Sequence, residues 1–168
     1  MLDLTSPRPM PPAHLTHPLL GPLEWDERRE RYRGLRGALS FTISPFSRTP
    51  RAERTAEELD QVAAVLDRAA RRLGLCLERE EAVKERAVEC LLHVYNEHWR
   101  HEWDPESQEE TELPALDAAG FKARLHFEAV DLQLALDGTV WLADGGLFAG
   151  HRIGVPFDTQ GALLEASF

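Results

Sequence analysis

The strongest structural signal lies in residues 55–73, where apolar side chains recur at steps of three and four residues. This spacing places them on one face of an α-helix, with polar residues on the opposite face. The apolar face consists of Leu59, Val62, Ala63, Leu66, Ala69, Ala70 and Leu73. Thr55 and Glu58 fit a capping box, in which two side chains bind the free amide groups of a helix start. We therefore predict a helix that begins after Thr55 and ends at Gly74.

A second helix is predicted over residues 79–103, with a wider apolar surface and only a narrow polar stripe. We expect it to be the central, more buried helix. Asn96 lies within this segment, next to Tyr95. Because a buried and unpaired amide is costly, we expect the Asn96 side chain to bind a neighbouring loop or strand.

Strand signals flank the helical segment on both sides. Residues 19–43 contain short β-prone runs punctuated by glycine, and four apolar runs lie between residue 125 and the C-terminus, separated by Asp-Gly, Asp-Gly-Gly and Thr-Gln-Gly. This punctuation is typical of an antiparallel meander. Asp117 could cap a short helix over residues 118–124. The sequence thus predicts an α+β fold, with two main helices packed on one face of an antiparallel sheet meander.

A proline-rich segment opens the chain. Four prolines between Pro7 and Pro12 remove backbone donors and restrict φ. We expect residues 1–18 to form a disordered leader and residues 19–168 to form a single α+β domain, because a chain of this length supports one hydrophobic core.

The charge balance favours some partners over others. The formal net charge is −10, which repels the phosphate backbone, so we expect no nucleic-acid binding. A basic protein partner fits better. Acidic side chains gather in residues 104–114, which we interpret as a solvated acidic loop rather than a regular element. Within it, the candidate partner-binding residues are Glu106, Glu109, Glu110 and Glu112.

The N-terminal residues lack the features of a signal peptide, and no run of apolar residues is long enough to cross a membrane. We expect a soluble, cytoplasmic protein without membrane contact. Cys76 and Cys90 form no Cys-x-x-Cys motif, which disfavours a disulfide framework or a thiolate metal cluster. Phosphate-binding, dinucleotide-binding and calcium-binding motifs are absent as well, so we expect no cofactor.

One candidate metal site lies on the second helix. His93, Glu97 and His101 follow each other at four-residue steps, so they would share one helix face. Imidazole and carboxylate suit zinc or another divalent ion. However, the metalloprotease pattern HExxH is absent, and ligands on one straight helix cannot surround an ion. We therefore interpret this face as a solvated surface.

A candidate catalytic group consists of Asn96, Asp144 and His151. Asp144 and His151 flank a glycine-rich turn and offer a base with an orienting carboxylate. No serine or cysteine lies in a nucleophile context such as GxSxG. A structural role for His151, with hydrogen bonds across the turn or to the central helix, is the favoured interpretation.

The segments LLHVYNEHW and ADGGLFAGH resemble a bacterial domain-of-unknown-function family, number 2262. The similarity covers most of residues 18–165 and leaves the leader outside. The matching positions are Tyr95, Asn96, Trp99, Phe121, Asp144, Gly145, Leu147, Phe148, Gly150 and His151. Ala149 departs from the pattern, which has tryptophan there. The resemblance implies a prokaryotic α+β fold and singles out Asn96 and His151, but it implies no activity.

Two functions remain open. The favoured one is a non-catalytic protein-interaction module, either immunity-like or an adaptor, whose acidic surface binds a basic protein. The alternative is a small metal-binding protein or hydrolase that uses His, Asp and Glu residues. The second requires those groups to converge in one pocket. An edge strand of the meander could also pair with a second copy in a homodimer.

Overall fold

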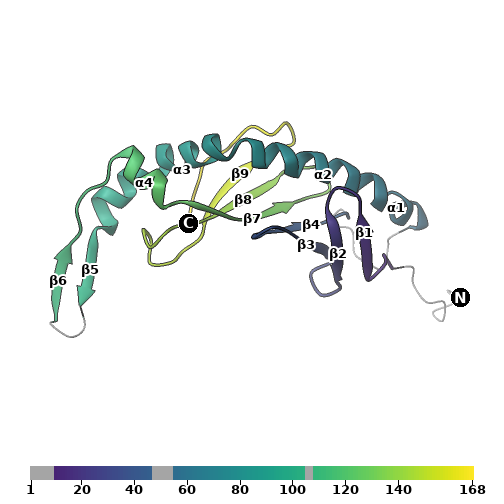
Figure 1. Ribbon diagram of the computed structural model, residues 1–168, viewed down its shortest axis with the longest axis horizontal. Coiled ribbons are helices and arrows are strands. Elements are labelled where there is room, and N and C mark those ends of the chain that lie inside the picture. Colours follow the sequence, from purple (N-terminus) through teal and green to yellow (C-terminus); the bar gives the residue numbers. More distant parts are fainter. Residues whose placement is uncertain (1–9, 47–54, 105–107) are drawn as a thin grey trace, which may run out of the picture.

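The computed structural model describes residues 10–46, 55–104 and 108–168. A seven-stranded sheet forms one layer, and a row of helices covers one of its faces (Figure 1). The predicted α+β fold, with the main helices on one face of the sheet, is confirmed. The C-terminus lies on the sheet side of the helices, and a short hairpin extends from the end of the molecule far from β1 (Figure 1).

The sheet has the strand order β1-β2-β3-β4-β7-β8-β9. Its neighbours are antiparallel, as a meander requires, except that β4 pairs with β7 in parallel. A parallel pair needs a long crossover connection, and the helices and the hairpin supply it here. The strands are β1 (His14–His17), β2 (Gly21–Asp26), β3 (Arg31–Arg36), β4 (Leu39–Ile43), β7 (His126–Leu132), β8 (Gly138–Ala143) and β9 (Ile153–Phe157).

The helices are α1 (Ala56–Asp60), α2 (Val62–Glu78), α3 (Glu80–Val94), the π-helical turn η2 (Tyr95–Trp99) and α4 (Ala118–Arg124). The predicted capping box is confirmed, since Glu58 N donates to Thr55 Oγ1 at 3.3 Å and Thr55 N donates to Glu58 Oε2 at 2.8 Å. Asp117 caps α4 as predicted, accepting from Gly120 N. In the described part of the chain, no helix combines the length and the apolar character needed to cross a membrane.

Helix α2 continues through Gly74, so the prediction that the first helix ends there is wrong. Glycine in a helix interior costs only about 1 kcal/mol relative to alanine. Leu73 and Cys76, on either side of Gly74, are both buried in the core. Their burial favours continuing the helix and outweighs the penalty of the glycine.

The second helix is shorter than predicted. Helix α3 ends at Val94, η2 follows, and the chain becomes extended from His101 onward. The predicted helix to residue 103 is therefore wrong in its last turn. The backbone leaves the helical conformation at Arg100, where φ is −87° and ψ is 10°.

Strand β1 lies within the predicted disordered leader, so that prediction is wrong for residues 14–17. The imidazole of His17 is buried and holds this strand to the helical layer, because its Nε2 lies 3.1 Å from Asp67 Oδ1. Its Nδ1 accepts from the backbone amide of Leu20. Tyr32 Oη donates to the carbonyl oxygen of Pro12. Residues 1–9 of the predicted leader lie outside the described residues.

The sheet alternates between a core face and an open face. On β4, the residues Leu39, Phe41 and Ile43 are buried, while Ser40 and Thr42 are half-buried, as expected when successive side chains point to opposite faces. On the open face, Asp131 accepts from Thr42 Oγ1 at 2.5 Å and from Trp141 Nε1 at 2.8 Å. The polar groups of this face are thus bonded to one another across neighbouring strands.

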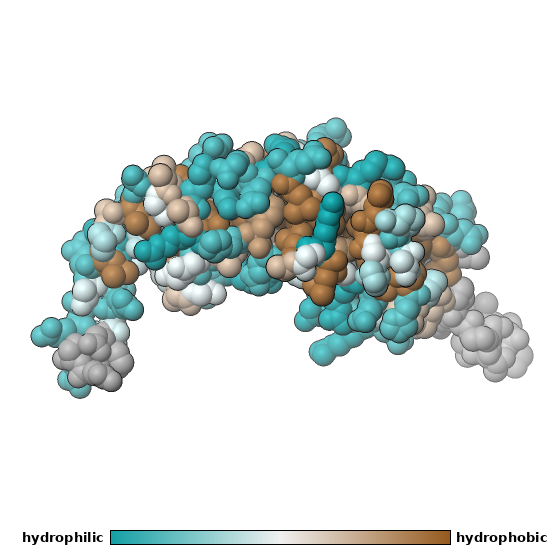
Figure 2. Space-filling model, in the orientation of Figure 1, coloured by the Kyte–Doolittle hydropathy of each residue, from teal (hydrophilic) through white to brown (hydrophobic). Residues whose placement is uncertain are grey.

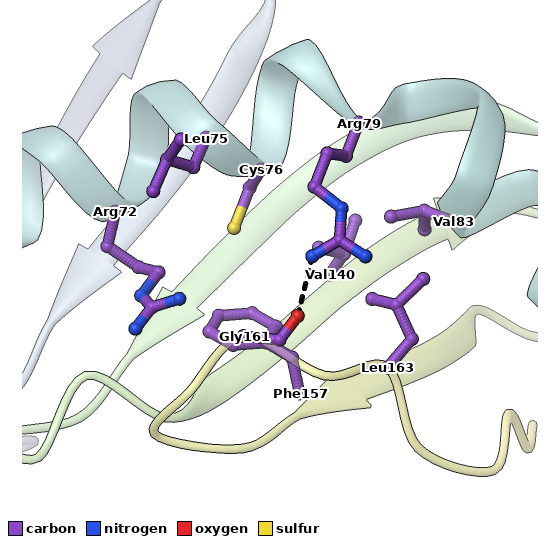
Figure 3. A pocket seen from close by; sticks show the side chains of 9 residues that line it. All are labelled: Arg72, Leu75, Cys76, Arg79, Val83, Val140, Phe157, Gly161 and Leu163. Carbon is purple, nitrogen blue, oxygen red and sulfur yellow. Dashed lines mark hydrogen bonds between the residues drawn. The ribbon is translucent and has the colours of Figure 1, made fainter.

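A small cavity of about 20 Å³ lies between α2 and the loop after β9 (Figure 3). Arg79 Nη1 donates to the carbonyl oxygen of Gly161 at 2.6 Å, and Arg72 Nη2 donates to that of Thr159 at the same distance. Burial raises the pKa of the Cys76 thiol from 9.0 to about 11, although Arg72 and Arg79 oppose the shift. Cys76 is therefore a buried side chain whose thiol stays protonated at neutral pH.

We expect the protein to lose stability in alkali. Burial raises the pKa of Cys76 to about 11 and that of Tyr32 to about 12. The folded state therefore holds both protons more tightly than the unfolded state, whose pKa values are near 9.0 and 10.0. Their contribution is complete below pH 9 and is lost as the pH rises toward 12. Urea unfolding across this range should show a shallower decline in the Tyr32→Phe, Cys76→Ala double variant; equal slopes would contradict the expectation.

Candidate functional site

Asn96 lies in η2 and fastens the helix to the segment that leads into α4. Its Nδ2 donates to the carbonyl oxygen of Leu116 at 2.9 Å, and its Oδ1 accepts from Leu116 N at 3.0 Å. The predicted bond between this amide and a neighbouring loop is confirmed. Both functional atoms of the Asn96 side chain are thus already bonded to backbone.

Asp144 follows β8 and organises the loop that connects it to β9. The side chain is 4% exposed. Its Oδ2 accepts from Phe148 N at 2.6 Å and from Gly150 N at 3.1 Å, while its Oδ1 accepts from Gly146 N at 3.0 Å. Gly146 and Gly150 have φ values of 85° and 80°, which glycine adopts without strain. The carboxylate therefore serves as the centre of a tight loop.

His151 closes the same loop but lies at the surface. Its backbone N–H donates to the carbonyl oxygen of Phe148, while its ring lies 6.2 Å from that of Trp99 and 6.3 Å from that of Phe168. Within the described residues, no hydrogen bond joins the imidazole to Asp144. Phe148 is buried among the aromatic rings of Tyr95, Trp99, Phe121 and Phe168.

Among the described residues, no hydrogen bond joins the three candidate catalytic residues to one another. Asn96 binds Leu116, Asp144 binds amides of its own loop, and His151 packs against aromatic rings. A nucleophile and a base need to lie within hydrogen-bond distance of each other. The geometry of these three residues instead supports a role in architecture.

The three candidate metal ligands do not share one helix face. His93 lies on α3 and Glu97 on η2, whereas His101 belongs to the strand that follows. The π-helical turn and the end of the helix break the four-residue spacing, so the expectation of a common face is wrong for His101. Among the described residues, no group of three or more His, Cys, Asp and Glu side chains is placed to hold a metal ion.

A two-stranded hairpin stands away from the body of the molecule (Figure 1). We call residues 100–113 the arm; it contains β5 (His101–Asp104) paired antiparallel with β6 (Glu109–Glu112). Three of the predicted partner-binding glutamates, Glu109, Glu110 and Glu112, lie on β6 and are exposed. Glu106 lies outside the described residues. The predicted loop is thus a strand over residues 109–112, although its solvent exposure was expected.

Between positions 101 and 112 the arm carries six acidic residues and no lysine or arginine. They are Glu102, Asp104, Glu106, Glu109, Glu110 and Glu112. Figure 2 shows mainly hydrophilic residues on the arm, at the left of the view. Trp103 differs from these hydrophilic residues, because its side chain is large and aromatic and yet 61% exposed.

Arg100 fixes the base of the arm. Its Nε donates to the carbonyl oxygen of Asn96 at 2.8 Å, and its Nη1 donates to that of Leu113 at 2.9 Å. Its Nη2 also forms an ion pair with Glu112 at 2.5 Å. One guanidinium thus connects η2 to the β6 side of the arm. Arg100 is not among the predicted functional residues, since a single arginine next to a predicted helix end gives no signal for such a role.

An open cavity of about 450 Å³ lies where the base of the arm meets the Asp144 loop. Its lining residues are Tyr95, Trp99, His101, Glu102, Leu113, Pro114, Leu116, Arg124, Gly146, Leu147 and Ala149. Ala149, where the resemblance noted in the sequence led us to expect tryptophan, is one of them. The lining includes no serine, threonine or cysteine that could act as a nucleophile.

The two segments singled out by their sequence therefore meet at the base of the arm. A family model described as an uncharacterized protein conserved in bacteria, DUF2262, matches residues 17–168. The chain belongs to this family. No curated protein and no solved structure matches this DUF2262 protein. The family match covers every element of the described fold from β2 to β9 and only the last residue of β1.

We expect Asp144→Ala to lower the free energy of unfolding of the DUF2262 protein by about 3 kcal/mol, because three loop amides lose a charged acceptor in a buried place. Asp158→Ala is the matched control. Asp158 Oδ1 accepts from Gln160 N and Ala162 N in an exposed loop, where water can replace it. Denaturant unfolding measures both, and equal losses would contradict the structural role of Asp144.

We expect Arg100→Met to loosen the arm and leave the core nearly unchanged, since methionine keeps the apolar stem but loses every guanidinium contact. Amide hydrogen exchange over residues 108–113 should accelerate, while exchange in the central strands stays slow. Arg152→Met, which breaks an exposed pair with Glu128, is the control. Unchanged exchange in the arm would show that Arg100 does not hold it.

Proposed function

We propose that this DUF2262 protein is a non-catalytic, cytoplasmic protein-interaction module, immunity-like or an adaptor, whose arm binds a basic protein. The observation that carries the proposal is the arm itself, a hairpin that stands away from the core with its β6 residues exposed. A two-stranded hairpin is at best marginally stable without further packing. A surface of this kind gains stability when a partner covers it.

The charges on the arm support a basic partner. Residues directly opposite one another in an antiparallel pair are close, and like charges there are destabilising. Asp104 and Glu109 occupy such opposite positions. Within the described residues, no cation lies at ion-pair distance from Glu102 or Glu109. Cationic side chains of a partner would relieve this repulsion, and electrostatic complementarity favours the correct partner over others.

The alternative of a hydrolase or metal-binding protein has less support. Asn96 and Asp144 use their polar atoms in bonds to backbone. The cavity at the base of the arm has charged and apolar lining but no serine, threonine or cysteine. An interaction module does not require catalytic or metal-binding side chains to converge in one pocket, and it is therefore the function we propose.

The proposal predicts that charge reversal on the arm abolishes partner binding. The full chain serves as bait in a lysate of the source bacterium, beside the triple variant Glu109→Lys, Glu110→Lys, Glu112→Lys. The control triple, Glu57→Lys, Asp60→Lys, Glu78→Lys, makes the same charge change at exposed sites on α1 and α2. A specific partner should be captured by the wild type and the control, and lost with the arm triple or with added salt.

Two outcomes would overturn the proposal. Capture of the same partner by the arm triple would show that the arm charges are not needed. Equal loss with both triples would show that only the net charge matters, and not the arm.

A further inference from the structure

One contact at the base of the arm determines which cross-strand pairs of the hairpin are hydrogen-bonded. Leu113 N donates to the carbonyl oxygen of Arg100, so these two residues form a hydrogen-bonded pair of the ladder. Hydrogen-bonded and non-hydrogen-bonded pairs alternate along antiparallel strands. Trp103 and Glu110, three steps further out in the same register, therefore form a non-hydrogen-bonded pair. The backbone N–H and C=O of Trp103 consequently point away from β6.

The outer edge of β5 is open. In the described part of the chain, β5 has β6 as its single strand neighbour. By the same alternation, His101 also directs its backbone N–H and C=O outward. This edge thus presents the donors and acceptors of two residues in the arrangement that an added strand requires.

The side chains beside this edge select a cation. Trp103 and Glu110 lie directly opposite each other, so the indole and the carboxylate share one face of the arm. Both are more than half exposed. A guanidinium can stack on an indole and bind a carboxylate at once, because it is planar and carries several donors.

We propose that the outer edge of β5 binds an extended, arginine-containing segment of a partner protein as a third strand, with one arginine over the ring of Trp103. This inference rests on the proposed function and names the chemistry of the partner. A second copy of this chain is a poor occupant of the edge. Its arm carries the same acidic residues and the whole chain has a net charge of −10.

The test uses the full chain and a fluorescent peptide of roughly eight residues that alternates arginine with threonine or valine. Binding should protect the backbone amides of His101 and Trp103 from hydrogen exchange, whereas Glu102, already bonded within the hairpin, should change little. N-methylation of every second peptide amide, in the set that faces β5, should weaken binding about tenfold, whereas N-methylation of the remaining amides should not.

Side-chain variants separate the indole from the edge. Trp103→Leu should weaken peptide binding about threefold, and Trp103→Phe should weaken it less, because a ring that retains a π-face still attracts a cation. Lysine in place of arginine should bind more weakly. Leu35→Ala, at another exposed apolar residue remote in sequence from the arm, is the control and should have no effect.

Several results would overturn this inference. Absence of peptide binding at low salt would do so. So would a peptide affinity that is unchanged both by N-methylation of the peptide and by substitution of Trp103. Protection of the His101 and Trp103 amides before any peptide is added would point to a second copy on the edge. The proposed function is judged separately: arm-dependent capture of a cellular partner together with any of these results would keep it and reject the added strand.

Discussion

The backbone of β4 pairs in parallel with that of β7, and through this contact two antiparallel meanders become one sheet. Ser40 to Ile43 lie beside Ala129 to Leu132, so segments almost ninety positions apart are held in register. The chain between them must travel from one end of a strand to the start of its parallel neighbour. This crossover connection places α2 and α3 over the same face of the sheet and leaves the arm at the far end of the row of helices (Figure 1).

Sequence patterns predicted the features that depend on local chemistry. The capping box at Thr55, the cap at Asp117 and the amide bonds of Asn96 follow from what those side chains can bind nearby. The patterns failed where tertiary contacts decide. Gly74 stays helical because the residues around it are buried. Strand β1 is held in place because the imidazole of His17 contacts Asp67 on α2. The prediction of a loop is wrong for residues 109–112 because strand pairing there depends on register and on Arg100, which no acidic composition reveals.

The candidate site shows the same difference between what local sequence predicts and what tertiary contacts decide. The patterns singled out Asn96, Asp144 and His151; in the structure Asn96 and Asp144 bind backbone groups, and the ring of His151 lies near that of Trp99. A sequence shows that a buried carboxylate follows a strand, yet it does not show whether that carboxylate faces a cavity or its own loop. The backbone amides of Gly146, Phe148 and Gly150 settle the question for Asp144.

The contacts of Arg100 also bear on the entropy of association. A hairpin on a flexible tether would sample many directions and would lose that freedom on docking, which weakens binding. Here the guanidinium joins the carbonyl oxygens of Asn96 and Leu113, and the Asn96 amide holds Leu116 a few residues beyond. The direction of the arm is thereby set by the same bonds that end the helix. For the partner that we propose, the arm is a preorganised projection, and little orientational freedom would remain to be lost on binding.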